Sequence, residues 1–314
     1  MPCAQQVRPL LAPLPPSSRE PVFETLFKEL EPHGRFDPLR GLGDPLLVSL
    51  DGTTYCASTT MHCPHGLPRQ LTHGQTLSDP TALPPVSVCP GRPDVSAWPP
   101  EDILPPAGEA KQDGAQQAGK RGRRTQAQAV ASHQRTSLGD ALSRQQPLCA
   151  LAQHQGWDGL LTCQPASPPK FYERLAVWQA NDGMAEREGR AGNGRVTAVT
   201  MERYVNDVLL RGGDEAWLVK GVESTVSNAK TGEQRDPHSL ITNHRPSAAN
   251  IAAVAQAGRG RWKIDNENHN VLKPTGDHRE HHLGHGPQYL AAFLLRLHLL
   301  AWLFHTVLAG SAEP

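Results

Sequence analysis

The sequence predicts an α/β fold that carries a β-rich insertion. Short apolar runs predict buried strands at residues 46–51, 135–140 and 156–163. A second group of β-like runs fills residues 164–245, and patterns typical of helices lie before and after the strands. Strands, a β-rich stretch and then long helices, in that order, are typical of an α/β domain with an insertion.

The N-terminal region combines an irregular start with one amphipathic helix. Residues 1–20 are rich in proline, and we expect them to be irregular. Residues 20–31 repeat apolar side chains at the 3.6-residue period of a helix, and Pro21 suits its first turn. The apolar positions are Val22, Phe23, Leu26, Phe27 and Leu30.

The first strand follows this helix. Residues 46–51 form an apolar run that ends at Asp51, and residues 83–89 form a second strand with two prolines at its start. Residues 90–126 are loop-like, and residues 141–155 can be helical.

The second half begins with strands and ends with helices. The β-like runs are residues 196–199, 217–219, 224–227 and 240–242, and Thr231-Gly232 predicts a turn between two of them. A long helix is predicted for residues 246–270, with Ser247 as its N-cap.

Residues 289–308 are almost entirely apolar and long enough to cross a membrane. Arg296 lies near the middle of this stretch, and a central arginine costs about 2.5–3.5 kcal/mol on insertion into a bilayer. We therefore expect a buried helix and no membrane contact. A membrane span and an interfacial or partner-binding helix are the alternatives.

The charge balance favours no particular partner. Lys plus Arg number 31 and Asp plus Glu number 31, so the formal net charge is zero, whereas DNA-binding proteins are usually basic. Binding to DNA then depends on local clusters such as the basic run Lys120, Arg121, Arg123 and Arg124. No signal peptide is recognised at the start and the cysteines form no close pairs, so we expect a cytoplasmic protein with reduced thiols.

Two aspartates follow apolar runs and are candidates for metal binding. Asp51 ends the run at 46–51, and Asp140 ends the run at 135–140. Mg²⁺ prefers hard oxygen ligands, and a carboxylate at a strand end can reach a cleft without being buried unpaired. Each aspartate can instead cap a turn or a helix, and Asp-Gly, as at Asp51, is a common turn signal.

A third candidate region is the segment Arg259–Lys273. It is unusually polar for a helix that also carries Trp262, Ile264, Val271 and Leu272. A solvated helix face with ion pairs is the simpler interpretation of these residues alone.

Three motifs in one order resemble bacterial insertion-sequence DDE transposases, the group with Tyr, Arg, Glu and Lys on one helix. LDGTTY at 50–55 is similar to the first-aspartate motif, and LGDAL at 138–142 to the second. RWKIDNENHNVLK at 261–273 resembles the segment that carries the last acid, and residues 284–308 resemble the C-terminal helix of one branch. Asp140 lies 89 residues after Asp51, and Asp265 lies 125 residues after Asp140, which matches the long gap for an inserted β-rich domain.

The resemblance implies an RNase-H-like fold with a central mixed sheet flanked by helices. It implies a catalytic domain in two parts around the insertion, three acids that bind two Mg²⁺ or Mn²⁺ ions, and cleavage and strand transfer of DNA. Double-stranded DNA at insertion-sequence ends and at the target is the implied partner, with a homodimer as the active form in the bacterial cytoplasm and nucleoid. The expected segments are 1–45 as an extension, 46–163 and 246–308 as catalytic domain, 164–245 as insertion and 309–314 as tail.

The resemblance makes Asp51 and Asp140 the first two acids and leaves the third open. Counted from Arg261, the position of the family glutamate falls on Asp265, whereas Glu267 has the matching side chain two residues later. On a regular helix Asp265 lies about 40° round from Arg261, and Glu267 lies about 200° from Asp265, so the two cannot face one site. Asp265 is favoured, and Glu267 is the alternative.

The same likeness makes Arg261 and Lys273 contacts for DNA phosphates. The family tyrosine is replaced by Gly258, and the gap from Asp265 to Lys273 is one residue longer than the usual pattern. Only 50 residues precede Asp51 and none predicts a DNA-reading motif, so we expect an N-terminally truncated copy. A catalytically inactive DNA-binding remnant is the alternative function.

Overall fold

The computed structural model describes residues 3–51, 53–55, 66–70, 76–92, 95–103, 134–140, 156–163, 169–192, 197–209, 218–262 and 288–312. The chain divides into two compact units, which are described separately. Unit 1 comprises Met1–Leu39, Val48–His133 and Trp262–Pro314, and unit 2 comprises Arg40–Leu47 and Gln134–Arg261.

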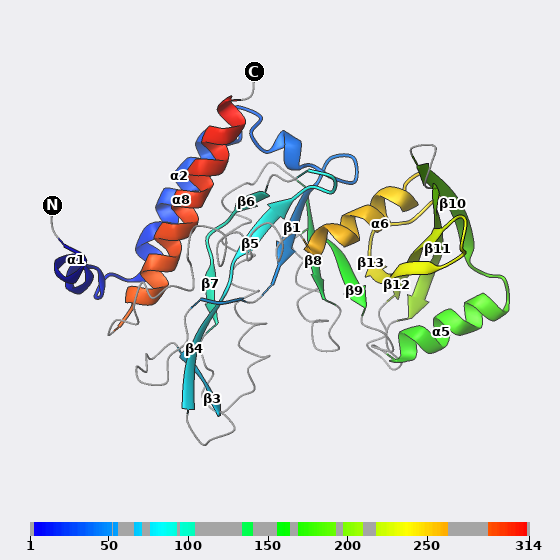
Figure 1. Cartoon of the computed structure of the whole chain (residues 1–314), viewed down its shortest axis with the longest axis horizontal. Coiled ribbons are helices and arrows are strands. Elements are labelled where there is room, and N and C mark those ends of the chain that lie inside the picture. Colours follow the sequence, from blue (N-terminus) through cyan, green and yellow to red (C-terminus); the bar gives the residue numbers. More distant parts are fainter. Residues whose placement is uncertain are drawn as a thin grey trace. The chain divides into compact units, whose positions relative to one another are not determined.

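Unit 2 is built on a mixed sheet. The strands are β1 (Leu46–Leu50, of which unit 2 holds the first two residues), β8 (Arg135–Asp140), β9 (Asp158–Cys163), β10 (Ala185–Gly192), β11 (Thr197–Leu209), β12 (Leu218–Asn228) and β13 (Gln234–Thr242). Their order is β10-β11-β12-β13-β9-β8-β1. β8 and β9 are parallel, whereas every pair from β9 to β10 is antiparallel (Figure 1). The strands predicted at 46–51, 135–140 and 156–163 are confirmed.

The β-like runs of the second half belong to long hairpins. The predicted runs overlap β11, β12 and β13, and β13 pairs with β9 in the same sheet. The turn from β12 to β13 contains Gly232 at φ +70°, and the Asn228 side chain accepts a hydrogen bond of 2.9 Å from the Lys230 N–H. The turn predicted at Thr231-Gly232 is thereby confirmed.

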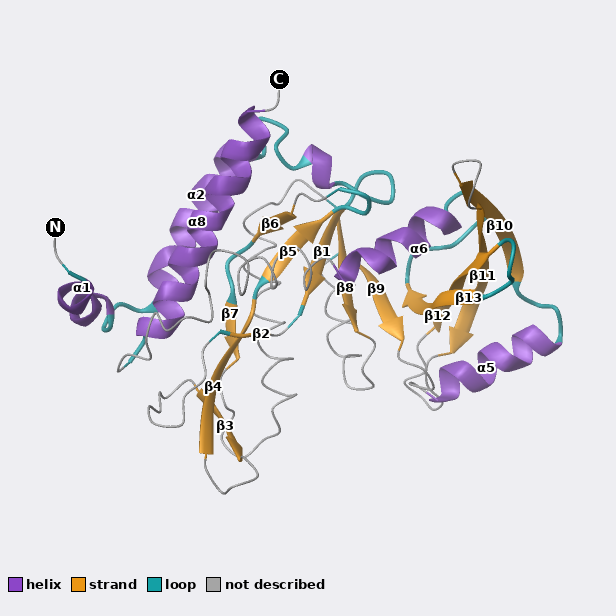
Figure 2. Cartoon of the chain, viewed as in Figure 1, coloured by secondary structure: helices purple, strands orange, loops and turns teal. Residues whose placement is uncertain are grey.

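Two helices cover opposite faces of the unit 2 sheet. α5 (Pro169–Ala180), which the sequence analysis did not predict, packs Phe171 and Leu175 in one core cluster with Ile241. On the other face, α6 (Ile251–Arg259) lies against Leu240, the neighbour of Ile241 in β13. Because successive side chains of a strand point to opposite faces, α5 and α6 lie on opposite sides of β13 (Figure 2).

Unit 1 combines short strands with helices. Its strands are the rest of β1, β2 (Thr53–Thr54), β3 (Gly66–Gln70), β4 (Thr76–Leu83), β5 (Pro85–Val88), β6 (Val95–Ala97) and β7 (Glu101–Ile103). β1, β5 and β6 are neighbours, β2-β4-β3 form a second sheet, and β7 also pairs with β4. The helices are α1 (Ala4–Leu11), η1 (Pro16–Arg19), α2 (Glu20–Leu30), η2 (Asp37–Leu39) and α8 (Leu290–Ala312).

The N-terminal segment differs from the expectation. The helix predicted at 20–31 is confirmed as α2, but the segment before it, which was expected to be irregular, contains α1 and η1. Pro9 lies inside α1, and Pro16 occupies the first position of η1, where a missing N–H costs no hydrogen bond. Proline content alone was therefore a poor guide to this segment.

An aromatic cluster forms much of the core of unit 1. Phe27 of α2 stacks on Trp98, with ring centroids 4.7 Å apart, and Phe36 completes the group. Trp98 is fully buried, and its Nε1–H donates a hydrogen bond of 2.7 Å to the Ser87 hydroxyl of β5. The helical period of residues 20–31 thus serves to bury Phe23 and Phe27.

Helix α8 carries a buried arginine. Within the part of the chain that the structure describes, Leu290–Leu308 is long and apolar enough to cross a membrane, a property that core helices share. Arg296 is 3% exposed and donates to Asp102 Oδ2 at 3.0 Å, to the Pro100 carbonyl at 3.0 Å and to the Ala292 carbonyl at 3.1 Å. Leu297 and Phe304 are exposed on this helix, so the absence of membrane contact stays a prediction.

Candidate functional site

The first two candidate acids lie where the sequence placed them along their strands. Asp51 is half-buried and follows the last residue of β1. Asp140 is the last residue of β8, and its Cα partner in the parallel strand β9 is Thr162. Each aspartate therefore stands at the carboxyl end of a strand.

The remaining candidates are mostly outside the described residues. These are Asp265, Glu267, Lys273, Lys120, Arg121, Arg123 and Arg124. Arg261 is described: it is half-buried in η3 (Gly260–Trp262), directly after α6.

The start of the helix that leads to Arg261 was predicted wrongly. α6 begins at Ile251, not next to Ser247. The Asn250 side chain turns back instead: it accepts from the Ser247 N–H at 2.7 Å and donates to the Arg245 carbonyl at 3.0 Å. These bonds hold residues 247–250 in a turn, which delays the α-helix by one turn.

Gly258, where the resemblance implies a tyrosine, is tightly packed against the sheet. A Cβ at this position would lie 2.5 Å from Leu240 Cδ1 and 3.0 Å from Leu160 Cδ2. Both leucines are almost fully buried, so they have little room to move. A tyrosine at position 258 is incompatible with this packing, and the close approach lets α6 lie directly on β13 and β9.

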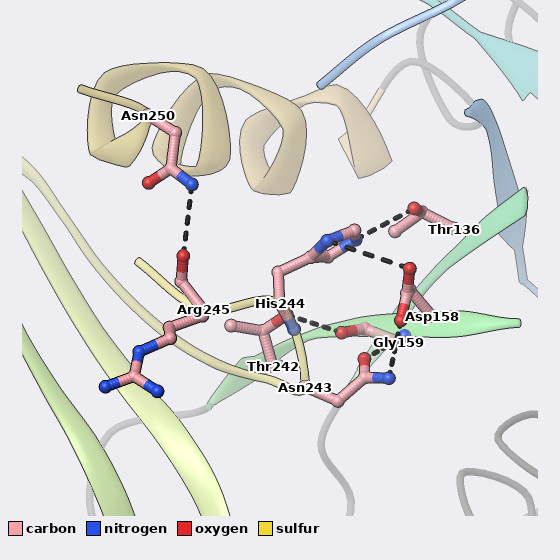
Figure 3. Close-up of polar contacts among 8 residues, drawn as sticks. All are labelled: Thr136, Asp158, Gly159, Thr242, Asn243, His244, Arg245 and Asn250. Atoms are coloured by element: carbon pink, nitrogen blue, oxygen red, sulfur yellow. Dashed lines mark hydrogen bonds and ion pairs between the residues drawn. The ribbon is translucent and has the colours of Figure 1, made fainter. Parts of the chain in front are cut away.

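A polar cluster occupies the amino ends of β8 and β9 (Figure 3). The Thr136 hydroxyl and His244 Nε2 share a hydrogen bond of 2.9 Å, and His244 Nδ1 lies 3.8 Å from Asp158 Oδ2. Asn243 donates to Asp158 Oδ1 at 2.7 Å and accepts from the Gly159 N–H at 2.6 Å. The cluster ties the chain between β13 and α6 to the two parallel strands.

Burial and the Asp158 carboxylate act in opposite directions on the pKa of His244. Burial lowers its pKa below the ordinary value near 6.5, and the nearby Asp158 carboxylate raises it less than burial lowers it. The Asp158 side chain is 40% exposed, so solvent weakens its attraction for a proton on the ring. A neutral imidazole can share its hydrogen bond with Thr136 without an ion pair.

A second histidine–threonine pair lies at the other end of the same strands. His238 is buried in β13, and its Nε2 shares a hydrogen bond of 3.3 Å with the Thr162 hydroxyl. Thr162 is the residue paired with Asp140. Neither histidine is predicted as a site residue from the sequence, where each is simply a polar residue inside or next to a β-like run.

Comparison of the sequence with protein-family models found no matching family, and comparison with curated proteins found no match. Among the residues that the structure describes, no group of three or more His, Cys, Asp or Glu side chains is placed to hold a metal ion. Asp51 and Asp140 nonetheless provide carboxylate oxygens, the donor type that Mg²⁺ and Mn²⁺ prefer.

Proposed function

We propose that the chain is a DDE transposase that cleaves and joins DNA with divalent metal ions. The observation that carries the proposal is the position of Asp51 and Asp140, each at the carboxyl end of a strand in an α/β fold. A mixed sheet flanked by helices is compatible with the RNase-H-like fold that the resemblance implies. Carboxylates carried by rigid strands are positioned more accurately for metal binding than carboxylates carried by loops.

The proposed roles follow from the chemistry of each residue. Asp51 and Asp140 bind the metal ions through carboxylate oxygens, together with Asp265 or, as the alternative, Glu267. When bound, two Mg²⁺ or Mn²⁺ ions supply activation of the attacking oxygen and stabilisation of the leaving oxygen.

Arg261 and Lys273 are proposed to hold DNA phosphates by charge-assisted hydrogen bonds. Arg261 is carried by the turn that continues α6. The tight packing at Gly258 fixes the end of α6 against β13, which supports a fixed position for Arg261.

The decisive measurement is metal-dependent nicking of a supercoiled plasmid that carries the DNA flanking this reading frame. Asp51→Asn and Asp140→Asn are expected to lower the rate at least about a hundredfold, because a catalytic metal contributes several kcal/mol. Asp44→Asn is the matched control, because Asp44 is an exposed aspartate that pairs with Arg40 at 2.6 Å and is not a proposed metal ligand. Equal rates in wild type and both strand-end variants would refute the proposal.

The inactive DNA-binding remnant is distinguished in the same preparation. A remnant gives sequence-specific, salt-sensitive gel shifts on the flanking DNA but no metal-dependent nicking by the wild-type chain. Nicking that disappears in Asp51→Asn excludes it.

A further inference from the structure

Two matched histidine–threonine pairs mark the two ends of the parallel strands β8 and β9. At the amino end, His244 Nε2 shares a hydrogen bond with Thr136 at 2.9 Å. At the carboxyl end, His238 Nε2 shares one with Thr162 at 3.3 Å. The register separates their surroundings, because Thr136 is paired with Asp158 and Thr162 is paired with Asp140.

The carboxyl-end pair adjoins Asp140, one of the proposed metal ligands. Thr162 lies between Asp140 of β8 and Leu240 of β13 in the backbone register. His238 precedes Leu240 by two residues, so it lies further toward the carboxyl end of β9, where β8 also ends. Asp140 comes four positions after Thr136 along β8, which corresponds to about 13 Å of strand, so the His244 pair is remote from Asp140.

A β-bulge determines where His238 lies. Ser224 and Val226 of β12 pair with His238 and Arg235 of β13, so β13 has one residue more than β12 between these two pairs. Pro237, which has no N–H to donate to the neighbouring strand, lies in this bulge. Bulges re-aim a side chain and are common beside active sites. The residue that directly follows the bulge is His238.

Buried polar residues also lie beside His238 on the next two strands of the sheet. Its register partner Ser224 is fully buried, and the partner of Ser224 is Glu202, which is 4% exposed and bound to Arg187 at 2.9 Å. Burying polar groups costs free energy that apolar side chains would avoid. Polar residues at this level of three adjacent strands therefore indicate a requirement other than packing.

We propose that His238 is a positioning residue for the metal-binding Asp140 and acts through Thr162. The hydrogen bond holds Thr162, the neighbour of Asp140 in the sheet, at the end of β9. The inference rests on the proposed function, because it takes Asp140 as a metal ligand.

The test measures the affinity of the full chain for Mn²⁺, by the loss of the free Mn²⁺ signal in electron paramagnetic resonance. His238→Ala and Thr162→Val are expected to raise the dissociation constant by up to about tenfold, the low end for residues that orient metal ligands. Thr162→Ser keeps the hydroxyl and is expected to restore wild-type affinity. His244→Gln, at the opposite end of the strands, is the matched control and is expected to leave Mn²⁺ affinity unchanged.

The outcomes separate this inference from the proposed function. Loss of Mn²⁺ binding in Asp140→Asn, with wild-type affinity in Thr162→Val and His238→Ala, overturns the positioning role alone. Wild-type affinity in Asp140→Asn instead overturns the metal site itself. If His238→Ala fails to fold, the comparison of Thr162→Val with Thr162→Ser decides, and equal affinities in that pair count against the positioning role.

Discussion

At His244, the ring lies 3.8 Å from a carboxylate, and yet its pKa is lowered. For the charged ring, the free-energy cost of losing its hydration on burial exceeds the stabilisation that the partly exposed Asp158 carboxylate provides. The hydrogen bond to Thr136 needs no charge, so the folded state favours the neutral ring. This preference links the stability of unit 2 to pH.

The predicted pH dependence follows from the direction of that shift. The folded pKa of His244 lies below the unfolded value near 6.5, so the unfolded chain binds more protons as the pH falls. The contribution of His244 is therefore complete above about pH 6.5 and is lost as the pH falls through the folded pKa. Between pH 7 and pH 5, the free energy of unfolding measured with urea is expected to fall more steeply for the wild type than for His244→Gln.

The difference between the two slopes cannot exceed about 1.4 kcal/mol per pH unit, the value for one proton. Glutamine keeps an amide that can bond the Thr136 hydroxyl but does not titrate, so other carboxylates affect both proteins alike. Identical slopes in the two proteins would show that His244 does not titrate differently in the folded state.

At the scale of an element, α8 depends on one internal ion pair. Arg296 and Asp102 are 4% and 17% exposed at their side chains, so neither charge is well solvated. Burial raises the pKa of the nearby Glu20. The charges of Glu24 and Asp102 raise this pKa further, whereas the charge of Arg296 lowers it. The guanidinium thus balances several acids beside an otherwise apolar helix.

Removing one member of this pair is expected to be costly. Arg296→Met leaves the Asp102 carboxylate without its cation, and such breaks in buried pairs cost about 3–5 kcal/mol in the free energy of unfolding. The double variant Arg296→Met/Asp102→Leu is expected to recover most of that loss, because it removes both charges of the buried pair together. Urea unfolding of the three proteins measures both effects, and a single variant as stable as wild type would contradict the expectation.

At the scale of the whole molecule, the balanced charge constrains how DNA can bind. With 31 basic and 31 acidic residues, no general attraction supports the proposed function. The DNA binding that we propose would then depend on local groups such as the basic run Lys120–Arg124 and Arg261. The slope of log affinity against log salt concentration measures the number of such contacts with DNA phosphates.

The basic run gives the corresponding prediction. Changing Lys120, Arg121, Arg123 and Arg124 to Gln together is expected to reduce the slope of log affinity against log salt by up to about 3.6, at about 0.9 for each phosphate contact. Gel shifts from 50 to 200 mM salt measure the slope. An unchanged slope would place the DNA contacts elsewhere in the chain.

Much of the element plan could be predicted because its signals are local. The helical period of residues 20–31 and the apolar runs that end at Asp51 and Asp140 were confirmed as α2, β1 and β8. Helix α5 was missed because its pattern is weakly apolar and mixed with charge. The start of α6 was misplaced because the Asn250 side chain closes a turn that local patterns do not distinguish from a helix.

By itself, the sequence determined several of the strands and helices and the two aspartates that follow or end strands, since periodicity depends on neighbours within about one turn or a few residues. Only the tertiary structure decided which strands pair and which distant side chains meet. Thr136 meets His244 across 108 residues, and Arg296 meets Asp102 across 194. The parallel register sets Asp140 beside Thr162, and the Thr162–His238 hydrogen bond spans 76 residues, so the positioning role proposed for His238 rests on contacts that only the tertiary structure provides.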